Sequence, residues 1–556
     1  MHRKNLLSMV LGSLALLVVA GSASAQVTTL HRMDGLAKGH WCGFSVAGVG
    51  DVNQDGCADL AVGAPGASPG GRGCAGQVRI FSGKDGSTVF TFDGLATGDY
   101  LGWSVAGAGD VNRDGFPDIL VGAYLADPPG RMSAGQATVF SGKDGSVLYR
   151  FDGLTAGETF GSSVAGAGDV NRDGYADIMV GAFRASTYTG QATVFSGKDG
   201  AVLHRFSGKA AGIAFGAAVG GAGDVNRDGY DDLIVSDSPA SWLTSETTVF
   251  SGRDGTVLHL FKGAAPGNGF GLAVAGAGDV NRDGYPDLIV GAYLADPGGR
   301  TDAGETLVFS GKDGITLHTF SGVAAGDGLG CSVAGAGDVD KDGYPDLIVG
   351  APLASPGGRT SAGQATLFSR KDGTVLCRFD GLAAGDVFGR SVASAGDVNR
   401  DLFPDLMVGA QFADPGGRTD AGQATVFSLA AWVISGSGSP RIGGTITLDL
   451  LAPGDQILPF QIGSSLGSGP IVIGNRTLGL SGDGLLLVSV SGFCPGIFQG
   501  YRGVIDNQCQ ARAAIGIPNH PTLIGVRIHT AFVTLDPNAP AGIKSISNTF
   551  SFTITT

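Results

Sequence analysis

The sequence predicts an all-β protein: a seven-bladed β-propeller of four-stranded blades, closed by an N-terminal strand and followed by a small β-sandwich-like C-terminal domain. Three observations support this fold class. An aspartate-rich loop recurs seven times at near-equal spacing, each copy is flanked by short segments rich in Val, Ile, Phe and Thr, and 98 of the 556 residues are Gly. Short strands joined by glycine turns in a repeat of this length are typical of propeller blades.

The first 25 residues have the pattern of a cleavable signal peptide. A basic tip containing Arg3 and Lys4 precedes an apolar run over residues 6–20, and the small residues Ala23-Ser24-Ala25 follow. This order is that of a secretory leader. A membrane-spanning helix is the alternative, but the apolar run is shorter than the roughly 20 residues that a bilayer requires. We therefore expect an exported protein, secreted or at the cell surface, with no membrane span after cleavage.

The acidic loop defines the repeat. Its first aspartates stand 59, 59, 55, 55, 59 and 59 residues apart along the chain. Seven units of nearly equal length indicate one closed array of blades, which we place at residues 26–428. The seven first aspartates are Asp51, Asp110, Asp169, Asp224, Asp279, Asp338 and Asp397.

Each unit contains four predicted strands, which we name A to D. In the third unit they cover residues 160–168, 176–182, 190–196 and 201–208, and Gly-rich turns divide them. Strand B is almost entirely apolar, which is typical of a strand covered on both faces. We therefore expect each strand B to lie between the neighbouring blades.

The ring is expected to close through the N-terminus. The seventh unit ends after its strand C and has no GKDG turn and no strand D of its own. Residues 27–35 match the strand D segments at 201–208 and 374–381. The mature N-terminus is therefore predicted to supply the outer strand of the seventh blade, which leaves no open sheet edge in the ring.

The repeat ends near residue 428. Residues 429–443 are rich in Ser and Gly and are predicted to form a linker, and residues 444–556 are predicted to form a separate domain. Segments such as 445–451 and 524–535 alternate apolar and polar residues, which favours a small antiparallel β-sandwich. An N-glycosylation sequon begins at Asn475.

The repeated loop has the composition of a cation site. In the fifth copy, Asp279, Asn281, Asp283 and Asp287 occupy positions 1, 3, 5 and 9, and Gly284 occupies position 6. A positive φ at position 6 allows these side chains and the position 7 carbonyl to converge. An all-oxygen set with several carboxylates favours Ca²⁺ over Zn²⁺, and a flexible loop favours it over Mg²⁺. The alternative is a series of Asx turns whose side chains cap their own backbone.

Repetition favours the cation, because all seven copies keep positions 1, 3, 5 and 9 while position 4 varies among Gln, Arg and Lys. We predict up to seven structural Ca²⁺ ions. The seventh is expected to be the weakest or missing, because Leu402 replaces Gly at position 6 and a Cβ at positive φ costs roughly 1 kcal/mol or more. The predicted ligands, loop by loop, are Asp51, Asn53, Asp55, Cys57, Asp59; Asp110, Asn112, Asp114, Phe116, Asp118; Asp169, Asn171, Asp173, Tyr175, Asp177; Asp224, Asn226, Asp228, Tyr230, Asp232; Asp279, Asn281, Asp283, Tyr285, Asp287; Asp338, Asp340, Asp342, Tyr344, Asp346; and Asp397, Asn399, Asp401, Phe403, Asp405.

These motifs resemble the FG-GAP repeats that form the seven-bladed propeller of integrin α-subunit heads. Phe160-Gly161 with Gly181-Ala182, and the two copies Gly63-Ala64-Pro65 and Gly350-Ala351-Pro352, carry the name-giving residues. The resemblance covers roughly residues 27–428 and implies a calcium-binding, adhesive propeller. The sequence departs from integrin heads because all seven units keep a version of the loop and no leg domains follow. A secreted bacterial relative is therefore expected.

The charge and the remaining motifs limit the function. A net charge of −14 lacks the basic footprint of a nucleic-acid-binding protein. We predict that the chain is not an enzyme, because its recurrent histidines (His31, His204, His259 and His318) and its strand A serines are features of the repeat. We expect an adhesion or protein-binding module. The alternatives are a glycan-binding lectin-like propeller, an enzyme or inhibitor built on the same scaffold, and a non-catalytic scaffold of an extracellular enzyme system.

The predicted strand directions place the acidic loops and the GKDG turns on one face, so the variable B-to-C and D-to-A loops share the other, here called the upper face. The third and fourth B-to-C loops are the shortest. We expect a dip there that binds an unknown extracellular protein or glycan. Its predicted contacts are Phe183, Arg184, Tyr188, Asp237 and Trp242. Packing of Trp242 into its own blade is the alternative.

Two disulfide bonds are predicted. Cys42 precedes strand A of the first unit and Cys74 precedes its strand C, so both lie near the upper face, and we expect them to pair. Cys57 lies at the opposite end of strand B, too far from Cys74 for a bridge. Cys494 is expected to pair with Cys509. Seven cysteines leave at least one unpaired.

Overall fold

The computed structural model describes residues 27–238, 243–340, 342–369 and 373–429, and the backbone of the strands between residues 433 and 553. Val27–Leu429 forms one compact unit, and the strands after residue 430 belong to a second. Over these described residues, no helix is long and apolar enough to cross a membrane.

Val27–Leu429 contains seven antiparallel four-stranded sheets, one for each repeat. Strands A are β2 (Ser45–Gly50), β6 (Ser104–Gly109), β10 (Ser163–Gly168), β14 (Ala218–Gly223), β18 (Phe270–Gly278), β22 (Ser332–Gly337) and β26 (Ser391–Gly396). Strands B are β3 (Asp59–Ala64), β7 (Asp118–Ala123), β11 (Asp177–Ala182), β15 (Asp232–Ser236), β19 (Asp287–Ala292), β23 (Asp346–Ala351) and β27 (Asp405–Ala410). Strands C are β4 (Gln77–Phe81), β8 (Gln136–Phe140), β12 (Gln191–Phe195), β16 (Glu246–Phe250), β20 (Glu305–Phe309), β24 (Gln364–Phe368) and β28 (Gln423–Ser428). Strands D are β5 (Thr88–Asp93), β9 (Val147–Asp152), β13 (Val202–Ser207), β17 (Val257–Lys262), β21 (Thr316–Ser321), β25 (Val375–Asp380) and, for the seventh blade, β1 (Thr28–Asp34).

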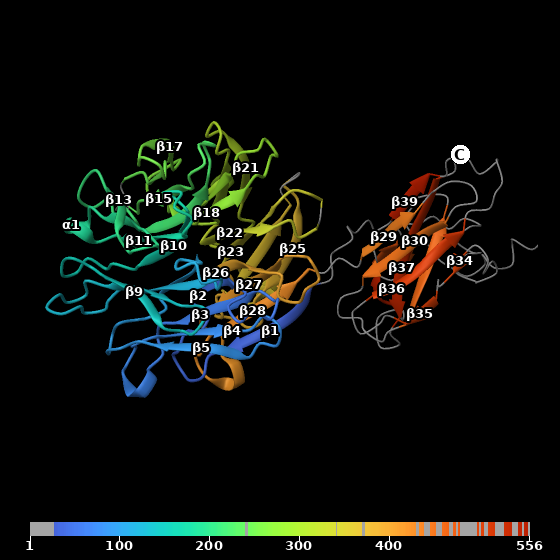
Figure 1. Ribbon diagram of the computed structural model, residues 1–556, viewed down its shortest axis with the longest axis horizontal. Coiled ribbons are helices and arrows are strands. Elements are labelled where there is room, and N and C mark those ends of the chain that lie inside the picture. Colours follow the sequence, from blue (N-terminus) through green and yellow to red (C-terminus); the bar gives the residue numbers. More distant parts are fainter. Residues whose placement is uncertain are drawn as a thin grey trace, which may run out of the picture. The chain divides into compact units, whose positions relative to one another are not determined.

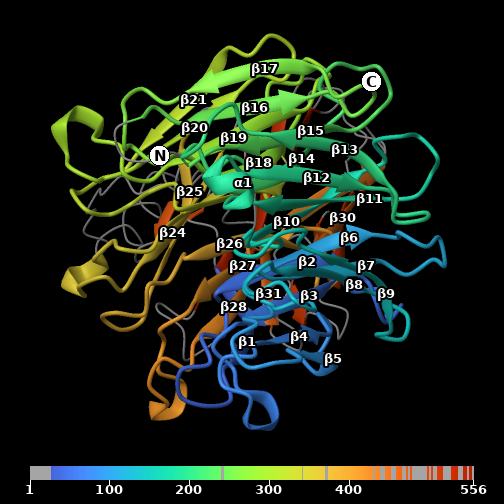
Figure 2. The same cartoon turned by 90° about the vertical axis from the view of Figure 1, so that its left-hand side faces the viewer.

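The blades form a closed ring. Each strand A contacts strand A of the next blade, and β26 of the seventh blade contacts β2 of the first. The chain colours therefore run around the ring from blue to orange, and the orange strands of the seventh blade lie beside the blue strands of the first (Figures 1 and 2). The predicted seven-bladed propeller with four-stranded blades is confirmed.

Strand β1 closes the ring as predicted. It pairs antiparallel with β28, from Thr28 opposite Ser428 to Asp34 opposite Gln423. Met33 on this strand is only 3% exposed and packs in a cluster shared by the first and seventh blades. Pairing and burial together fasten the two ends of the ring, and β1 lies beside β28 in Figure 2.

The hydrophobic core lies between the blades. Every residue of β3, β7 and the other strands B is buried, in agreement with the apolar pattern of the sequence. Leu120 of β7, for example, packs in a cluster with Ile178 and Val180 of β11 in the next blade. Removal of these apolar side chains from water is the main driving force for blade-to-blade packing.

The B-to-C loops contain short helical turns. Four of them are single 3-10 turns with the sequence Pro-Gly-Gly, namely η1 (Pro69–Gly71), η2 (Pro297–Gly299), η3 (Pro356–Gly358) and η4 (Pro415–Gly417). The shorter loop of the third blade contains α1 (Ala185–Tyr188) instead. Ser186, Thr187 and Tyr188 have φ values of 50°, 63° and 62°, so this turn is left-handed.

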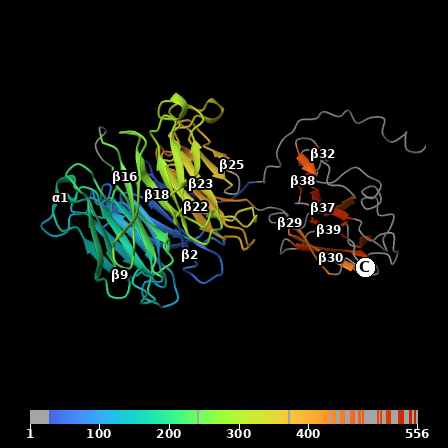
Figure 3. The same cartoon turned by 90° about the horizontal axis from the view of Figure 1, so that it is seen from above.

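The second unit contains only strands among its described residues (Figures 1 and 3). One sheet has the order β29-β30-β36-β34, and another has the order β35-β31-β37-β38, with β39 also paired to β37; β32 and β33 form a two-stranded hairpin. Their bounds are β29 (Val433–Gly438), β30 (Thr445–Leu451), β31 (Pro459–Ser465), β32 (Ile471–Ile473), β33 (Arg476–Leu478), β34 (Phe498–Gln499), β35 (Arg502–Val504), β36 (Gln510–Gly516), β37 (Arg527–Leu535), β38 (Ile543–Ile546) and β39 (Phe550–Thr553). β29 lies within the predicted linker 429–443.

The predicted disulfide between Cys42 and Cys74 is wrong, and both cysteines are free. The D-to-A loop that carries Cys42 packs against the seventh blade, where the backbone of Cys42 forms an isolated parallel β-bridge with Gly422. The B-to-C loop that carries Cys74 packs against the second blade, where the Cys74 carbonyl accepts the N–H of Tyr100. The two loops of one blade thus lean toward opposite neighbours. Cys494 and Cys509 lie outside the described residues.

Candidate functional site

Each acidic loop connects strands A and B, and its position 9 aspartate is the first residue of strand B. Asp59, which begins β3, is fully buried. Its Oδ2 accepts the N–H of Val52 at 2.9 Å, and its Oδ1 accepts the N–H of Gly83, in the C-to-D turn, at 2.9 Å. Asp118, Asp177 and Asp232 make the same pair of bonds in the next three blades. One carboxylate therefore joins the acidic loop to the neighbouring turn.

The side chains at positions 1, 3 and 5 fold over their own loop. In the fifth loop, Asp279 accepts the N–H groups of Asp283 and Gly284, and Asn281 accepts the N–H of Asp283. Asp283 in turn accepts the N–H of Tyr285. These are the bonds of Asx turns, as the alternative interpretation expects. A carboxylate has about four lone-pair sites, so these bonds orient its oxygens and leave capacity for a cation.

The backbone of the loop is left-handed at two positions. Position 6 glycines have φ between 82° and 89°, as their sequence role requires, from Gly56 to Gly343. Position 4 also has positive φ in six described loops, for example 57° at Arg282. The sequence gives no glycine at position 4, so this second left-handed residue was not predicted.

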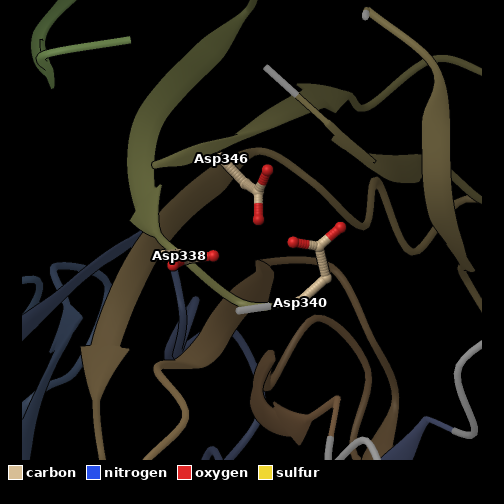
Figure 4. A group of neighbouring side chains, drawn as sticks. All are labelled: Asp338, Asp340 and Asp346. Carbon is tan, nitrogen blue, oxygen red and sulfur yellow. The ribbon is translucent and has the colours of Figure 1, made fainter. Parts of the chain in front are cut away.

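The sixth loop brings three carboxylates together. Asp338, Asp340 and Asp346 present oxygens that all lie within 4.8 Å of one another, and Figure 4 shows them turned toward a common point. Among the described residues this is the one such group of acidic, histidine or cysteine side chains. The cause is local, because the other six loops have Asn at position 3 where this loop has Asp340.

One oxygen of this group is buried without a hydrogen-bond partner. Asp338 Oδ2 accepts the N–H of Gly343 at 2.9 Å, whereas Asp338 Oδ1 has no partner. An unpaired buried carboxylate oxygen is costly in free energy, and a bound cation would remove that cost. The donor set and the unpaired oxygen therefore fit a hard divalent ion.

The seventh loop departs from the others at two positions. Leu402 replaces glycine and has a φ of 69°, yet its N–H still reaches Asp397 at 2.9 Å. Its side chain is 75% exposed. Asp405 Oδ1 is buried without a partner, because the chain continues from Ser428 into Leu429 and has no C-to-D turn to supply the N–H.

Burial raises the pKa of the position 9 aspartates, because their ionised form loses hydration. The pKa rises to about 6 for Asp59, Asp118 and Asp232 and to about 7 for Asp177, although backbone N–H groups oppose the shift. For Asp405 burial and the nearby charge of Asp401 raise the pKa to about 8. The highest of these five values belongs to the blade that lacks the turn donor.

Side chains at position 4 connect successive loops. Arg282 donates from Nε to the carbonyl of Gly343 at 2.7 Å, and its guanidinium carbon lies 4.0 Å from the ring centroid of Tyr344. Arg113, Arg172 and Arg227 lie over the position 7 tyrosine of the next loop in the same way. Guanidinium groups are attracted to aromatic faces. These residues form a belt of contacts around the face that carries the acidic loops.

The recurrent serines of strand A also connect blades. Ser45 Oγ donates to the Gly102 carbonyl at 2.8 Å, and Ser391 Oγ accepts the N–H of Val46 at 3.1 Å. Ser104, Ser163 and Ser332 make corresponding contacts with the next blade. The histidines of strand D contact a turn of the next blade, as His204 does at the Gly252 carbonyl. Both residue types therefore have structural roles.

The residues predicted to form the upper-face contact lie in different surroundings. Arg184 is exposed, and its guanidinium stacks 5.2 Å from Phe183 and 5.6 Å from Tyr188, which is 49% exposed. Asp237 is buried and accepts the N–H of Glu246 at 2.7 Å. Burial raises its pKa to about 7. Trp242 lies outside the described residues.

Comparison with known proteins agrees with this geometry. The FG-GAP repeat family matches residues 43–81, 101–140, 160–195, 270–309, 332–368 and 388–427. The chain is an FG-GAP repeat protein. The matched segments cover strands A to C of six blades. The fourth blade of this FG-GAP propeller forms the same four strands, although Ser236 and Asp237 replace its Gly-Ala pair.

The chain is homologous to integrin α subunits. It is 33% identical to integrin alpha-5 of Xenopus laevis over 278 residues (49% of this chain, 21% of that protein) and 32% identical to integrin alpha-V of Gallus gallus over 210 residues (35% and 20%). Integrin alpha pat-2 of Caenorhabditis elegans is 30% identical over 342 residues (59% and 24%). The chain thus spans about a fifth to a quarter of these relatives.

A solved structure described as the Dos1 propeller is also similar, with a TM-score of 0.38 and 11% identity over 67% of this chain and 76% of that one. FG-GAP repeats often bind Ca²⁺. The integrin α-like FG-GAP propellers are a non-catalytic family, which agrees with the prediction that the chain is not an enzyme.

The raised aspartate pKa values predict a pH dependence in metal-free protein. Between about pH 4 and pH 8 the folded state retains protons that the unfolded chain has released, so its free energy of unfolding falls as pH rises. We expect the melting temperature of protein transferred into calcium-free buffer to be several degrees lower at pH 8 than at pH 5. Scanning calorimetry at both values checks this. A higher melting temperature at pH 8 would contradict it.

Leu402 provides a test of loop strain. Leu402→Gly should raise the free energy of unfolding by about 1 kcal/mol, because it removes a Cβ from a left-handed position without loss of packing. Leu36→Gly is the matched control, since Leu36 is also exposed but has no positive φ. That control should lower the stability. Chemical denaturation of both variants gives the comparison, and equal losses would show that Leu402 is unstrained.

Proposed function

We propose that this chain is a secreted, calcium-binding, integrin α-like propeller that acts as an adhesion or protein-binding module. The observation that carries this proposal is the difference between its two faces. The acidic loops, the arginine belt and the turns repeat from blade to blade and contact one another. On the upper face, four B-to-C loops share a Pro-Gly-Gly turn, whereas those of the third and fourth blades are shorter and differ in sequence. Recognition sites are typically built on variable loops over a rigid scaffold.

We propose Ca²⁺ sites at positions 1, 3, 5 and 9 of the loops, with the carbonyl at position 7. In the first four loops and the seventh, no ion pair with Lys or Arg within 4.0 Å neutralises these aspartates among the described residues. A divalent cation would supply that charge and connect the loop to the start of strand B. The sixth loop, with three converging carboxylates, should bind most tightly, and the seventh most weakly.

We propose that the partner contacts the upper face over the third and fourth blades. The stack of Phe183, Arg184 and Tyr188 presents aromatic and guanidinium surfaces, which are enriched at binding hot spots. The left-handed turn beneath it is costly for Ser186 and Thr187, and strain of this kind often accompanies functional loops. Asp237, which directly follows β15, accepts the N–H of Glu246 at the start of β16.

The domain boundaries proposed from the sequence complete this assignment. Residues 1–25 act as a signal peptide, residues 26–428 form the propeller, and residues 444–556 belong to a β-sandwich that also includes β29 from the proposed linker 429–443. Export is consistent with homology to integrin α subunits. The matched relatives named here come from animals and do not support a bacterial source.

Removal of calcium should destabilise the propeller, because an ion that binds only the folded loops stabilises the folded state. We expect a chelator to lower the melting temperature and Ca²⁺, but not an equal concentration of Mg²⁺, to restore it. Asp338→Asn should reduce the gain from Ca²⁺, whereas Asp313→Asn, in an exposed turn, should leave the gain unchanged. A melting curve that is the same with and without bound metal would refute the proposal.

The binding surface is tested with captured extracellular proteins and a glycan array. For the partner so identified, Arg184→Ala and Trp242→Ala should each weaken binding by about tenfold or more without lowering the melting temperature. Arg205→Ala, an exposed arginine on the outer strand β13, should bind normally. Full binding by both upper-face variants would place the site elsewhere, and exclusive capture of glycans would favour a lectin.

A further inference from the structure

A cavity of about 700 Å³ opens on the upper side of the ring, where the seven strands A begin. All seven blades contribute to its lining, through the strand A serine or alanine and the residue that precedes it. Where the strand A residue is serine, its hydroxyl group is hydrogen-bonded to the backbone of a neighbouring blade. The preceding position differs in every blade and includes Phe44, Trp103 and Arg390. The volume of the cavity is in the range of ligand pockets.

The electrostatic character of the cavity is opposite to that of the protein. The chain contains 50 Asp and Glu residues against 36 Lys and Arg residues. Among the described residues that line the cavity, however, Arg390 is the one charged side chain and none is acidic. Its guanidinium has no carboxylate within 4.0 Å in the described part of the chain. The cavity therefore presents an unneutralised positive charge.

The guanidinium is held in place by weak contacts that leave most of its donors free. Its carbon lies 5.1 Å from the centroid of the Phe44 ring, and Nη1 is 3.9 Å from Cys331 Sγ. A guanidinium has five N–H donors in a planar fork that matches a carboxylate. Sulfur is a weak acceptor. A carboxylate entering the cavity would gain two charge-assisted hydrogen bonds.

An aromatic wall adjoins this charge. The Trp103 ring lies 4.4 Å from Phe44 and 4.2 Å from Tyr124, measured between centroids. Because these rings pack against one another and are partly buried, the wall exists before any ligand binds. A cation is a poor occupant, since Arg390 already covers Phe44 and would repel it. Apolar surface beside an arginine suits an acidic side chain together with the apolar atoms of its backbone.

We propose that this axial cavity receives a glutamate or aspartate side chain from a loop of the partner protein, with Arg390 as its ion-pair partner and Phe44 and Trp103 as the apolar wall. The proposal rests on the protein-binding function proposed above and extends it toward the axis, because Phe183 and Tyr188 of the proposed upper-face contact also line the cavity. The volume exceeds that of one side chain and accommodates the tip of a loop. The lining serines support the wall, because their hydroxyl groups are engaged between blades.

Capped peptides test the cavity without knowledge of the partner. Trp103 lies in the wall, so binding should change its fluorescence. We expect the full-length protein to respond saturably to acetyl-Gly-Glu-Gly-amide and much less to the Gln and Lys analogues. Arg390→Gln should weaken the response by at least tenfold, Arg390→Lys should weaken it less, and Arg205→Ala should not change it. Trp103→Phe should remove the signal and identifies its source.

Several outcomes would overturn the inference. They are equal binding of the Gln or Lys peptide, an unchanged response in Arg390→Gln, and no saturable response to the Glu peptide at millimolar concentration. Preferential binding of glucuronate over the Glu peptide would assign the cavity to an acidic sugar instead. Circular dichroism shows whether each variant is folded. If Arg390→Gln does not fold, Arg390→Lys, which keeps the positive charge, is compared with the wild type instead. If Arg184→Ala loses partner binding but still binds the Glu peptide, the conclusion about the axial cavity is unaffected.

Discussion

The fold depends on a carboxylate buried at the start of each central strand. Asp59 and its counterparts enter the core beside wholly apolar strands, where an ionised group is stable only if it is well partnered. One oxygen is bonded to the acidic loop and the other to the C-to-D turn, so strand, loop and turn must be correctly placed together. The seventh blade shows the cost of departing from this arrangement. Its outer strand comes from the N-terminus, the turn is absent, and Asp405 is left with an unpaired oxygen and a pKa of about 8.

Recurrent side chains also connect each blade to the next around the ring. Residues that recur in most of the blades mainly connect neighbours. The position 4 arginines contact the next acidic loop, the strand D histidines contact the next turn, and the strand A serines bridge adjacent backbones. These contacts concentrate on the lower face, the axis and the outer rim. The upper loops contribute as well, because the arginines of four B-to-C loops donate to the glycine carbonyl that follows a strand D, as Arg72 does at Gly94. The shorter third and fourth loops depart from this sequence pattern.

The periodicity of the sequence was sufficient to predict the number of blades, the strand order and the closing strand, because each repeat must bury the same apolar strand. Contacts between repeats were harder to predict. Arg282 and Gly343 are 61 residues apart, and only the curvature of the ring brings them together. The error over Cys42 and Cys74 has the same cause, since two loops at one end of a blade face different neighbours. The serine contacts, by comparison, do have a signal in the sequence. Serine recurs at the same position in five strands A, with Ala218 and Ala273 in the other two.

Adjacent positions at the start of strand A separate stability from recognition. The serine side chain lies between blades and is fixed by the backbone of its neighbour, whereas the residue before it projects into the axial cavity and differs in all seven blades. The residue at this position is Phe44 in one blade, Leu272 in another and Arg390 in a third. These differences alter the chemistry of the cavity but not the contacts that close the ring. Because strand alternation places successive side chains on opposite sides, the repeat can remain regular in structure while it is irregular in the surface that it offers to a partner.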